Sequence, residues 1–233
     1  MTRNEQITEN YNRVLEKIEE AKAARGSGFD SDVTLLAATK TVAAEDILFA
    51  TDKLGLTHVG ENRAEELVAK YPALAGHAEL HIIGTLQRRK VKTVATMADM
   101  IESVDSLPLA AEIDKRFGAA GRKVRVLVEV NSGREEAKGG VMPEDVHSFC
   151  DELEQYGNIE LAGLMTMAPI CEKSDDYRKY FSETYRIFID IFGKKPHNIR
   201  EYVLSMGMSD SFVPAILEGA TQVRVGSAIF GHR

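Results

Sequence analysis

Short strand-like runs and helix-like runs alternate along almost the whole of this chain, and this alternation restricts the fold more than any other feature. Most of the strand-like runs are apolar on both faces, as parallel strands buried under helices are. They cover residues 34–39, 57–59, 79–83, 100–104, 123–130, 159–165, 202–204 and 222–225. Eight strands in strict βα alternation predict a closed barrel of parallel strands inside a ring of helices.

The runs between the predicted strands have the apolar spacing of helices. They cover residues 43–54, 63–70, 87–97, 107–120, 143–156, 175–192 and a last stretch that ends near residue 220. An amphipathic helix over residues 4–24 precedes the first strand, with Ile7, Tyr11 and Val14 spaced three or four apart. The predicted fold class is therefore α/β, a single-domain (β/α)8 TIM barrel with an extra N-terminal helix. An open, doubly wound sheet is the alternative, and the lack of a GxGxxG after the first strand counts against a dinucleotide-binding fold.

Composition limits the class of protein. The 233 residues, 44% of them hydrophobic, suit one domain over 1–233 with a sizeable core. The net charge of −7 argues against a dedicated nucleic-acid binder, and no apolar run is long enough to span a bilayer. Cys150 and Cys171 match no metal or redox spacing, and the N-terminus has no secretory pattern. We therefore expect a reduced, cytoplasmic protein.

Residue types that suit a binding site follow several predicted strands. Lys40 comes directly after the first strand, residues 205–210 (SMGMSD) follow the seventh, and Gly226 and Ser227 follow the eighth. Glycine lets backbone N–H groups approach a phosphate closely, and serine adds a hydroxyl donor. In a barrel these strand ends face one mouth, where phosphate sites often follow the seventh and eighth strands. We therefore expect a phosphorylated ligand at this mouth.

Lys40 and Arg224 indicate which ligand this is. Apolar residues precede Lys40, so we expect a partly buried stem, which lowers the pKa of the amine and frees it to form a Schiff base. A solvated lysine that ends the strand is the alternative. A lysine, an arginine and two phosphate-like loops predict pyridoxal 5′-phosphate (PLP), with its aldehyde on Lys40 and its pyridine nitrogen facing Arg224. The phosphate would contact Ser205, Gly207, Gly226 and Ser227.

Several motifs then match a known family. They are KT at 40–41, GENRAEEL at 60–67, HIIGTLQRRK at 81–90, GLM at 163–165, SMGMSD at 205–210 and RVGSAIFG at 224–231. These motifs resemble those of the YggS/PROSC family of PLP homeostasis proteins, which shares the barrel of the alanine racemase N-terminal domain. The resemblance implies PLP held on Lys40, and it places Asn62, Met165 and Met208 near the cofactor. It also implies that the protein buffers and delivers PLP without established catalytic turnover.

The chain departs from the family pattern in two places. Arg88 and Arg89 replace a polar pair, and together with Lys90 and Lys92 they form a basic helical run. This run is either a solvated face or a contact for a phosphate or a partner. The chain also stops at residue 233, without the aromatic tail of many members.

An amino-acid racemase is the main alternative function. An arginine beside the pyridine nitrogen keeps that nitrogen unprotonated, which makes the ring a poorer electron sink than pairing with a carboxylate does. Racemases of this type also take a second acid/base residue from a further domain, for which the chain is too short, so any racemisation would be weak and one-sided. An open mouth suits a carrier of PLP. The expected recipients are PLP-dependent apoenzymes, and the expected oligomeric state is a monomer. A class I aldolase is a third, less favoured possibility.

Two further residue patterns have ordinary explanations. Asn62 precedes a predicted helix at Arg63, so helix capping is the first interpretation of its side chain. His77 and His81 are spaced i,i+4, but His81 begins a strand and no HExxH pattern is present. The sequence therefore predicts no metal site.

Overall fold

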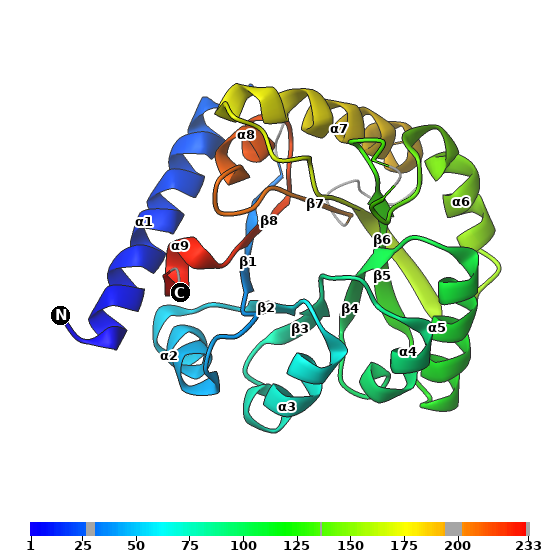
Figure 1. Ribbon diagram of the computed structural model, residues 1–233, viewed down its shortest axis with the longest axis horizontal. Helices are drawn as coiled ribbons and strands as arrows, with labels where there is room; N and C mark the ends of the chain where they lie inside the picture. The colour runs from blue at the N-terminus through cyan, green and yellow to red at the C-terminus, as the bar shows by residue number, and fades with distance from the viewer. Residues whose placement is uncertain (27–30, 136, 194–201, 232–233) are drawn as a thin grey trace.

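The computed structural model describes residues 1–26, 31–135, 137–193 and 202–231. In these residues eight parallel strands close into a barrel in chain order, with β8 paired to β1 (Figure 1). The strands are β1 (Thr34–Ala38), β2 (His58–Glu61), β3 (Glu79–Ile82), β4 (Met100–Val104), β5 (Val124–Val130), β6 (Ile159–Thr166), β7 (Val203–Met206) and β8 (Gln222–Val225). The predicted (β/α)8 barrel is confirmed.

Helices surround this barrel on its outer side (Figure 1). They are α1 (Arg3–Ala24), α2 (Ala44–Leu54), α3 (Ala64–Leu74), α4 (Arg88–Val94), α5 (Leu107–Ala119), α6 (Val146–Leu153), α7 (Arg178–Phe192), α8 (Phe212–Leu217) and α9 (Ser227–Phe230), with short 3-10 turns η1 (Pro143–Asp145) and η2 (Ser174–Tyr177). The short α9 was not expected from the sequence. Helix α3 also runs past Pro72, because a proline in the last turn removes only one N–H from the hydrogen-bond ladder.

Helix α1 is the extra element beside the barrel. Its first turn has a capping box, in which the Thr2 hydroxyl accepts from the Glu5 N–H and the Glu5 carboxylate accepts from the Thr2 N–H. Its buried stripe consists of Ile7, Tyr11, Val14, Ile18 and Ala21. In Figure 1 this helix lies beside α8 and α9, and it contacts both. Burial of this stripe therefore ties the start of the chain to the segment that follows β7.

The main apolar core lies between the strands and the helices, on the outer face of the barrel. The outward residues of β5, from Val124 to Val130, belong to this core. The inner face holds a small apolar cluster of Met100, Leu127, Ala162 and Met165, and Leu36 is buried there as well. The remaining space inside holds buried polar residues such as Glu102, so the expectation of strands apolar on both faces is wrong for several of them. Barrels of this type more often fill their interior with branched aliphatic side chains.

The longest helices of the structure carry too many charged and polar residues to lie across a lipid bilayer, and no helix in the described ranges qualifies as a membrane span.

Replacing Ile7 by alanine should lower the free energy of unfolding by about 2–4 kcal/mol, because this side chain is fully buried where α1 meets the barrel. Urea denaturation followed by circular dichroism measures the change. Leu15→Ala is the matched control on the same helix, since Leu15 is 36% exposed and should cost less than about 1 kcal/mol. Equal losses in the two variants would contradict the packing of α1 described above.

Candidate functional site

A cavity of about 750 Å³ opens at the carboxyl ends of the strands, within the size range of small-molecule sites. At its rim Arg3 of α1 and Asp46 of α2 form an ion pair of 2.8 Å. Most of the residues predicted from the sequence to hold the cofactor line this cavity. They are Lys40, Asn62, Met208, Arg224, Gly226 and Ser227.

Lys40 lies in the turn after β1 and is exposed. Strand β1 ends at Ala38, and the buried position after it is taken by Thr39 rather than by the lysine. The next residue, Thr41, has a φ of 64°, a left-handed conformation that strains a β-branched residue. Such strain persists only where surrounding contacts hold the backbone, so the turn that presents Lys40 is fixed.

Two charged residues that sequence reasoning missed hold this turn. The Thr39 carbonyl accepts from the Val42 N–H at 2.9 Å and from the Lys70 ammonium at 2.7 Å. Lys70 and the Thr39 hydroxyl also both donate to Glu61 Oε1, each at 2.7 Å. Burial raises the pKa of Glu61, against the opposing effect of Lys70. Lys70 and Glu61 thus hold the backbone that presents Lys40, and neither residue lines the cavity.

Arg224 on β8 is almost fully buried beneath the cavity that it lines. Its guanidinium donates to Ser205 Oγ at 2.6 Å and to the Thr166 carbonyl at 2.9 Å. Burial lowers the pKa of Arg224, and the nearby carboxylates of Glu102 and Glu129 oppose this effect. A guanidinium has five N–H donors, so these two bonds leave others for a ligand.

Three of the predicted cofactor residues do not line the cavity. The Ser205 hydroxyl is buried inside the barrel and donates to Glu102 at 2.7 Å. Gly207 has a φ of +87°, and a Cβ there would lie 2.6 Å from Ala215 Cβ, so the glycine permits close packing against α8. Met165 packs in the small apolar cluster inside the barrel. All three lie beneath the site rather than at its surface.

Ser209, four residues after Ser205, is the serine of this motif that reaches the cavity. It lines the cavity, and its Oγ accepts from the backbone N–H groups of Gly226 and Ala228 at 3.3 and 3.4 Å. Since these bonds use the oxygen as an acceptor, the hydroxyl proton can donate to a ligand. Gly226 permits this close arrangement, because a Cβ there would lie 2.7 Å from the Ala38 carbonyl oxygen.

Asn62 lines the cavity and does not cap a helix. Helix α3 begins at Ala64, its N-cap position is Arg63, and the cap makes no side-chain hydrogen bond. Strand β2 continues to Glu61, so Asn62 is the first residue beyond the strand at the barrel mouth. The capping interpretation is therefore wrong.

Inside the barrel, Glu102 connects four strands. Its Oε1 lies 2.6 Å from His81 Nδ1 and accepts from Gln222 at 2.7 Å, while its Oε2 accepts from Ser205. Burial acts to raise the pKa of Glu102, but the hydrogen bond and charge of His81, the charge of Arg224 and the hydrogen bond from Ser205 together hold the pKa below its ordinary value. Burial likewise acts to lower the pKa of His81, and the carboxylates of Glu102 and Glu79 raise it to about 9.

The basic run on α4 lies away from the cavity. Arg88, Arg89 and Lys92 are exposed, and Lys90 pairs with Glu65 of α3. None of the four lines the cavity at the barrel mouth. Both interpretations of this run, a solvated face and a contact for a partner, agree with its exposure.

Comparison with known proteins adds a family to this geometry. The family model of the alanine racemase N-terminal domain matches residues 10–233. The chain is 40% identical over 226 residues to a pyridoxal phosphate homeostasis protein of Aquifex aeolicus, with 97% of each chain covered. An unknown protein from Bifidobacterium adolescentis is similar with a TM-score of 0.87 and 38% identity over 98% of this chain and 96% of its own. PipY of Synechococcus elongatus with PLP bound has a TM-score of 0.77 and 29% identity, with 93% of this chain and 99% of PipY covered.

The buried carboxyl of Glu129 should make stability fall with rising pH. Burial, and to a smaller extent the negative charge of Asp105, raises the pKa of Glu129 from 4.5 to about 7. The folded state therefore holds this proton more tightly, and the stability present below pH 4.5 is lost as the pH rises through about 7. Relative to Glu129→Gln, the wild-type protein should lose about 1–3 kcal/mol between pH 5 and pH 8.

Urea denaturation at the two pH values measures this difference. Glu160→Gln is the control, because Glu160 is an exposed carboxylate on the neighbouring strand β6. The same pH dependence in wild type and Glu129→Gln would show that Glu129 titrates normally.

Proposed function

This chain belongs to the family of pyridoxal phosphate homeostasis proteins, and we propose that its cavity holds PLP through a Schiff base on Lys40. The observation that carries the proposal is the exposed amine of Lys40 in a cavity that also contains a buried arginine and two serines. A relative with the same fold has PLP bound, which supports the choice of ligand.

The residues present fit the three chemical parts of PLP. When bound, PLP supplies the aldehyde that joins the Lys40 amine. Ser209 and Ser227 line the cavity with hydroxyl groups suited to a phosphate, and Gly226 keeps the backbone open beside them. Arg224 offers N–H donors to the ring nitrogen. Because a guanidinium stays protonated at neutral pH, it does not transfer a proton to that nitrogen. Asn62 and Met208 complete the walls that the ring would contact.

The role in homeostasis rests on the relatives rather than on the cavity alone. The curated relative from Aquifex aeolicus aligns over 97% of both chains and is named for PLP homeostasis, not for an enzymatic reaction. We therefore assign this protein to PLP binding and supply rather than to amino-acid racemisation. We further propose that residues 1–233 act as one PLP-binding domain, as a cytoplasmic monomer, and that PLP-dependent apoenzymes receive the cofactor.

Lys40→Ala should abolish the visible absorbance of the PLP-loaded protein while leaving the fold intact, because an exposed side chain contributes little to packing. Borohydride reduction followed by peptide mapping should place the pyridoxyl-phosphate mass on the peptide that contains Lys40. Lys53→Ala, which removes an exposed lysine of α2, should behave like wild type. A wild-type protein that stays colourless with PLP, or an adduct on another lysine, would overturn the proposal.

Ser209→Ala should weaken PLP binding about tenfold or more, because a hydrogen bond to a charged group contributes about 1.5–3 kcal/mol. Binding of pyridoxal, which lacks the phosphate, should stay unchanged in this variant. Titrations of both ligands, followed by absorbance, give the ratio of the two affinities.

Ser205→Ala is the informative comparison for this test. Its hydroxyl supports Arg224 from inside the barrel, so its loss should affect PLP and pyridoxal alike. A phosphate-selective loss in Ser205→Ala, with none in Ser209→Ala, would restore the assignment made from the sequence.

A further inference from the structure

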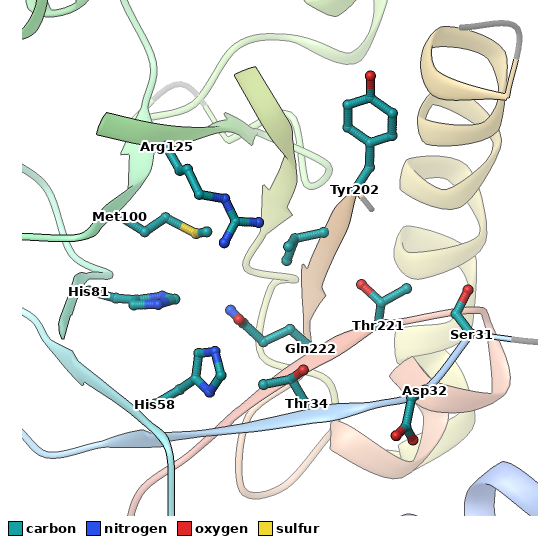
Figure 2. Close-up of a pocket in the computed structure, with 11 residues that line it drawn as sticks. Ser31, Asp32, Thr34, His58, His81, Met100, Arg125, Tyr202, Thr221 and Gln222 are labelled. Atoms are coloured by element: carbon teal, nitrogen blue, oxygen red, sulfur yellow. The ribbon is translucent and has the colours of Figure 1, made fainter. Parts of the chain in front are cut away.

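A second cavity, of about 500 Å³, opens at the opposite end of the barrel, where the strands begin. Figure 2 shows the imidazoles of His58 and His81 side by side at one wall, with Gln222 of β8 facing them from another strand. The two rings meet edge to face, with centroids 5.5 Å apart. The PLP proposal uses neither histidine.

His58, Glu79 and His81 form a compact group of nitrogen and oxygen ligands. The parallel pairing sets His58 of β2 directly beside Glu79 of β3, and His81 follows two residues later on the same face. Glu79 Oε2 lies 3.3 Å from His58 Nε2, and Glu79 Oε1 lies 3.4 Å from His81 Nε2. One candidate ligand atom from each of the three residues lies within 4.8 Å of the other two. All three ligands stand on strands, which are rigid supports.

His81 is already oriented as a ligand. It is completely buried, and Glu102 holds its Nδ1 at 2.6 Å. That contact turns Nε2 toward Glu79 and His58, and among the described residues Nε2 makes no hydrogen bond. Histidines that bind metals usually have the other ring nitrogen fixed by a carboxylate in this way. His58 has a weaker version of this support, with Nδ1 at 2.8 Å from the Thr57 hydroxyl.

We propose that His58, Glu79 and His81 bind a divalent transition-metal ion, with Zn²⁺ as the best-fitting case. Tetrahedral bonds of 2.0–2.1 Å place neighbouring ligand atoms about 3.3–3.4 Å apart, which matches the 3.3 Å between Glu79 Oε2 and His58 Nε2. Two histidines and one glutamate leave a fourth position open, and here that position faces the 500 Å³ cavity. Arg125 lies 3.4 Å from Glu79 Oε1, so Oε2 is the oxygen that remains for the metal.

The charges around His81 favour a cation between the carboxylates. Glu102 contacts one ring nitrogen and Glu79 approaches the other, so a positive charge at this ring is stabilised from both sides. The competing occupants are a proton on His81 and an anion held by Arg125 and the two imidazoles. An anion would have to lie beside the Glu79 carboxylate, which disfavours it.

Calorimetric titration of untagged, chelator-treated protein with ZnCl₂ tests the site. We expect one Zn²⁺ per chain in the wild type, and at least a 100-fold weaker affinity in His58→Ala and in Glu79→Gln. X-ray absorption of the zinc-loaded protein should show nitrogen and oxygen neighbours at about 2.0–2.1 Å. Circular dichroism of each variant establishes that it is folded, and these two positions at the barrel rim are chosen over the fully buried His81 for that reason.

His77→Ala is the matched control. His77 lies four residues before His81 and pairs with Asp52 at the surface, so its loss should change zinc affinity less than twofold. The proposal would be overturned by a wild type without stoichiometric zinc binding, or by variants that bind zinc as tightly as the wild type. Protonation of His81 would then be the remaining explanation for the arrangement. Phosphate binding in place of zinc would overturn it in favour of an anion. Zinc is measured directly, so either result is independent of PLP binding at Lys40.

Discussion

The buried carboxylate of Glu102 is the interaction on which the inside of this barrel depends. It lies on β4 and bonds to residues of β3, β7 and β8. The ladder between β7 and β8 has one registered pair, Ser205 with Gln222, between the backbone bonds from Thr221 to Leu204 and from Arg224 to Gly207. Both residues of that pair also bond to Glu102. Side-chain hydrogen bonds therefore reinforce the narrowest seam of the sheet. A buried charge is costly unless its partners are in place, so the same network that strengthens this seam also fixes the geometry around it.

This network also explains how the cavity at the barrel mouth keeps its shape. Arg224 is held from below by Ser205, which in turn is held by Glu102. The guanidinium therefore reaches the cavity from a fixed position rather than as a mobile surface side chain. His81 approaches Glu102 from the other end of the barrel, so the two cavities have one hydrogen-bonded chain between them. The polar residues inside the barrel therefore position side chains at both of its ends, which aliphatic residues in the same places could not do.

The sequence was sufficient for the barrel and for much of the mouth, but not for the interior. Alternating strands and helices predict the fold, and Lys40, Arg224 and Ser227 follow from their places at strand ends. Ser205 was expected at the surface of the mouth because the predicted strand stopped at residue 204, whereas β7 continues to Met206 and that serine is buried inside the barrel. Asn62 was read as a cap because the helix was expected to begin one residue early. Glu102 and His81 were missed because the contacts of inward residues depend on strand register, which one sequence does not reveal.

The rigid turn at Lys40 is the feature of the mouth that follows most directly from the fold. Lys70 and Glu61 hold the backbone of Thr39 by hydrogen bonds, and Thr41 keeps a left-handed conformation on the other side of the lysine. The backbone on both sides of Lys40 is therefore fixed before any ligand binds. The Schiff base proposed above would need little reordering of the chain, and such preorganisation lowers the cost of binding.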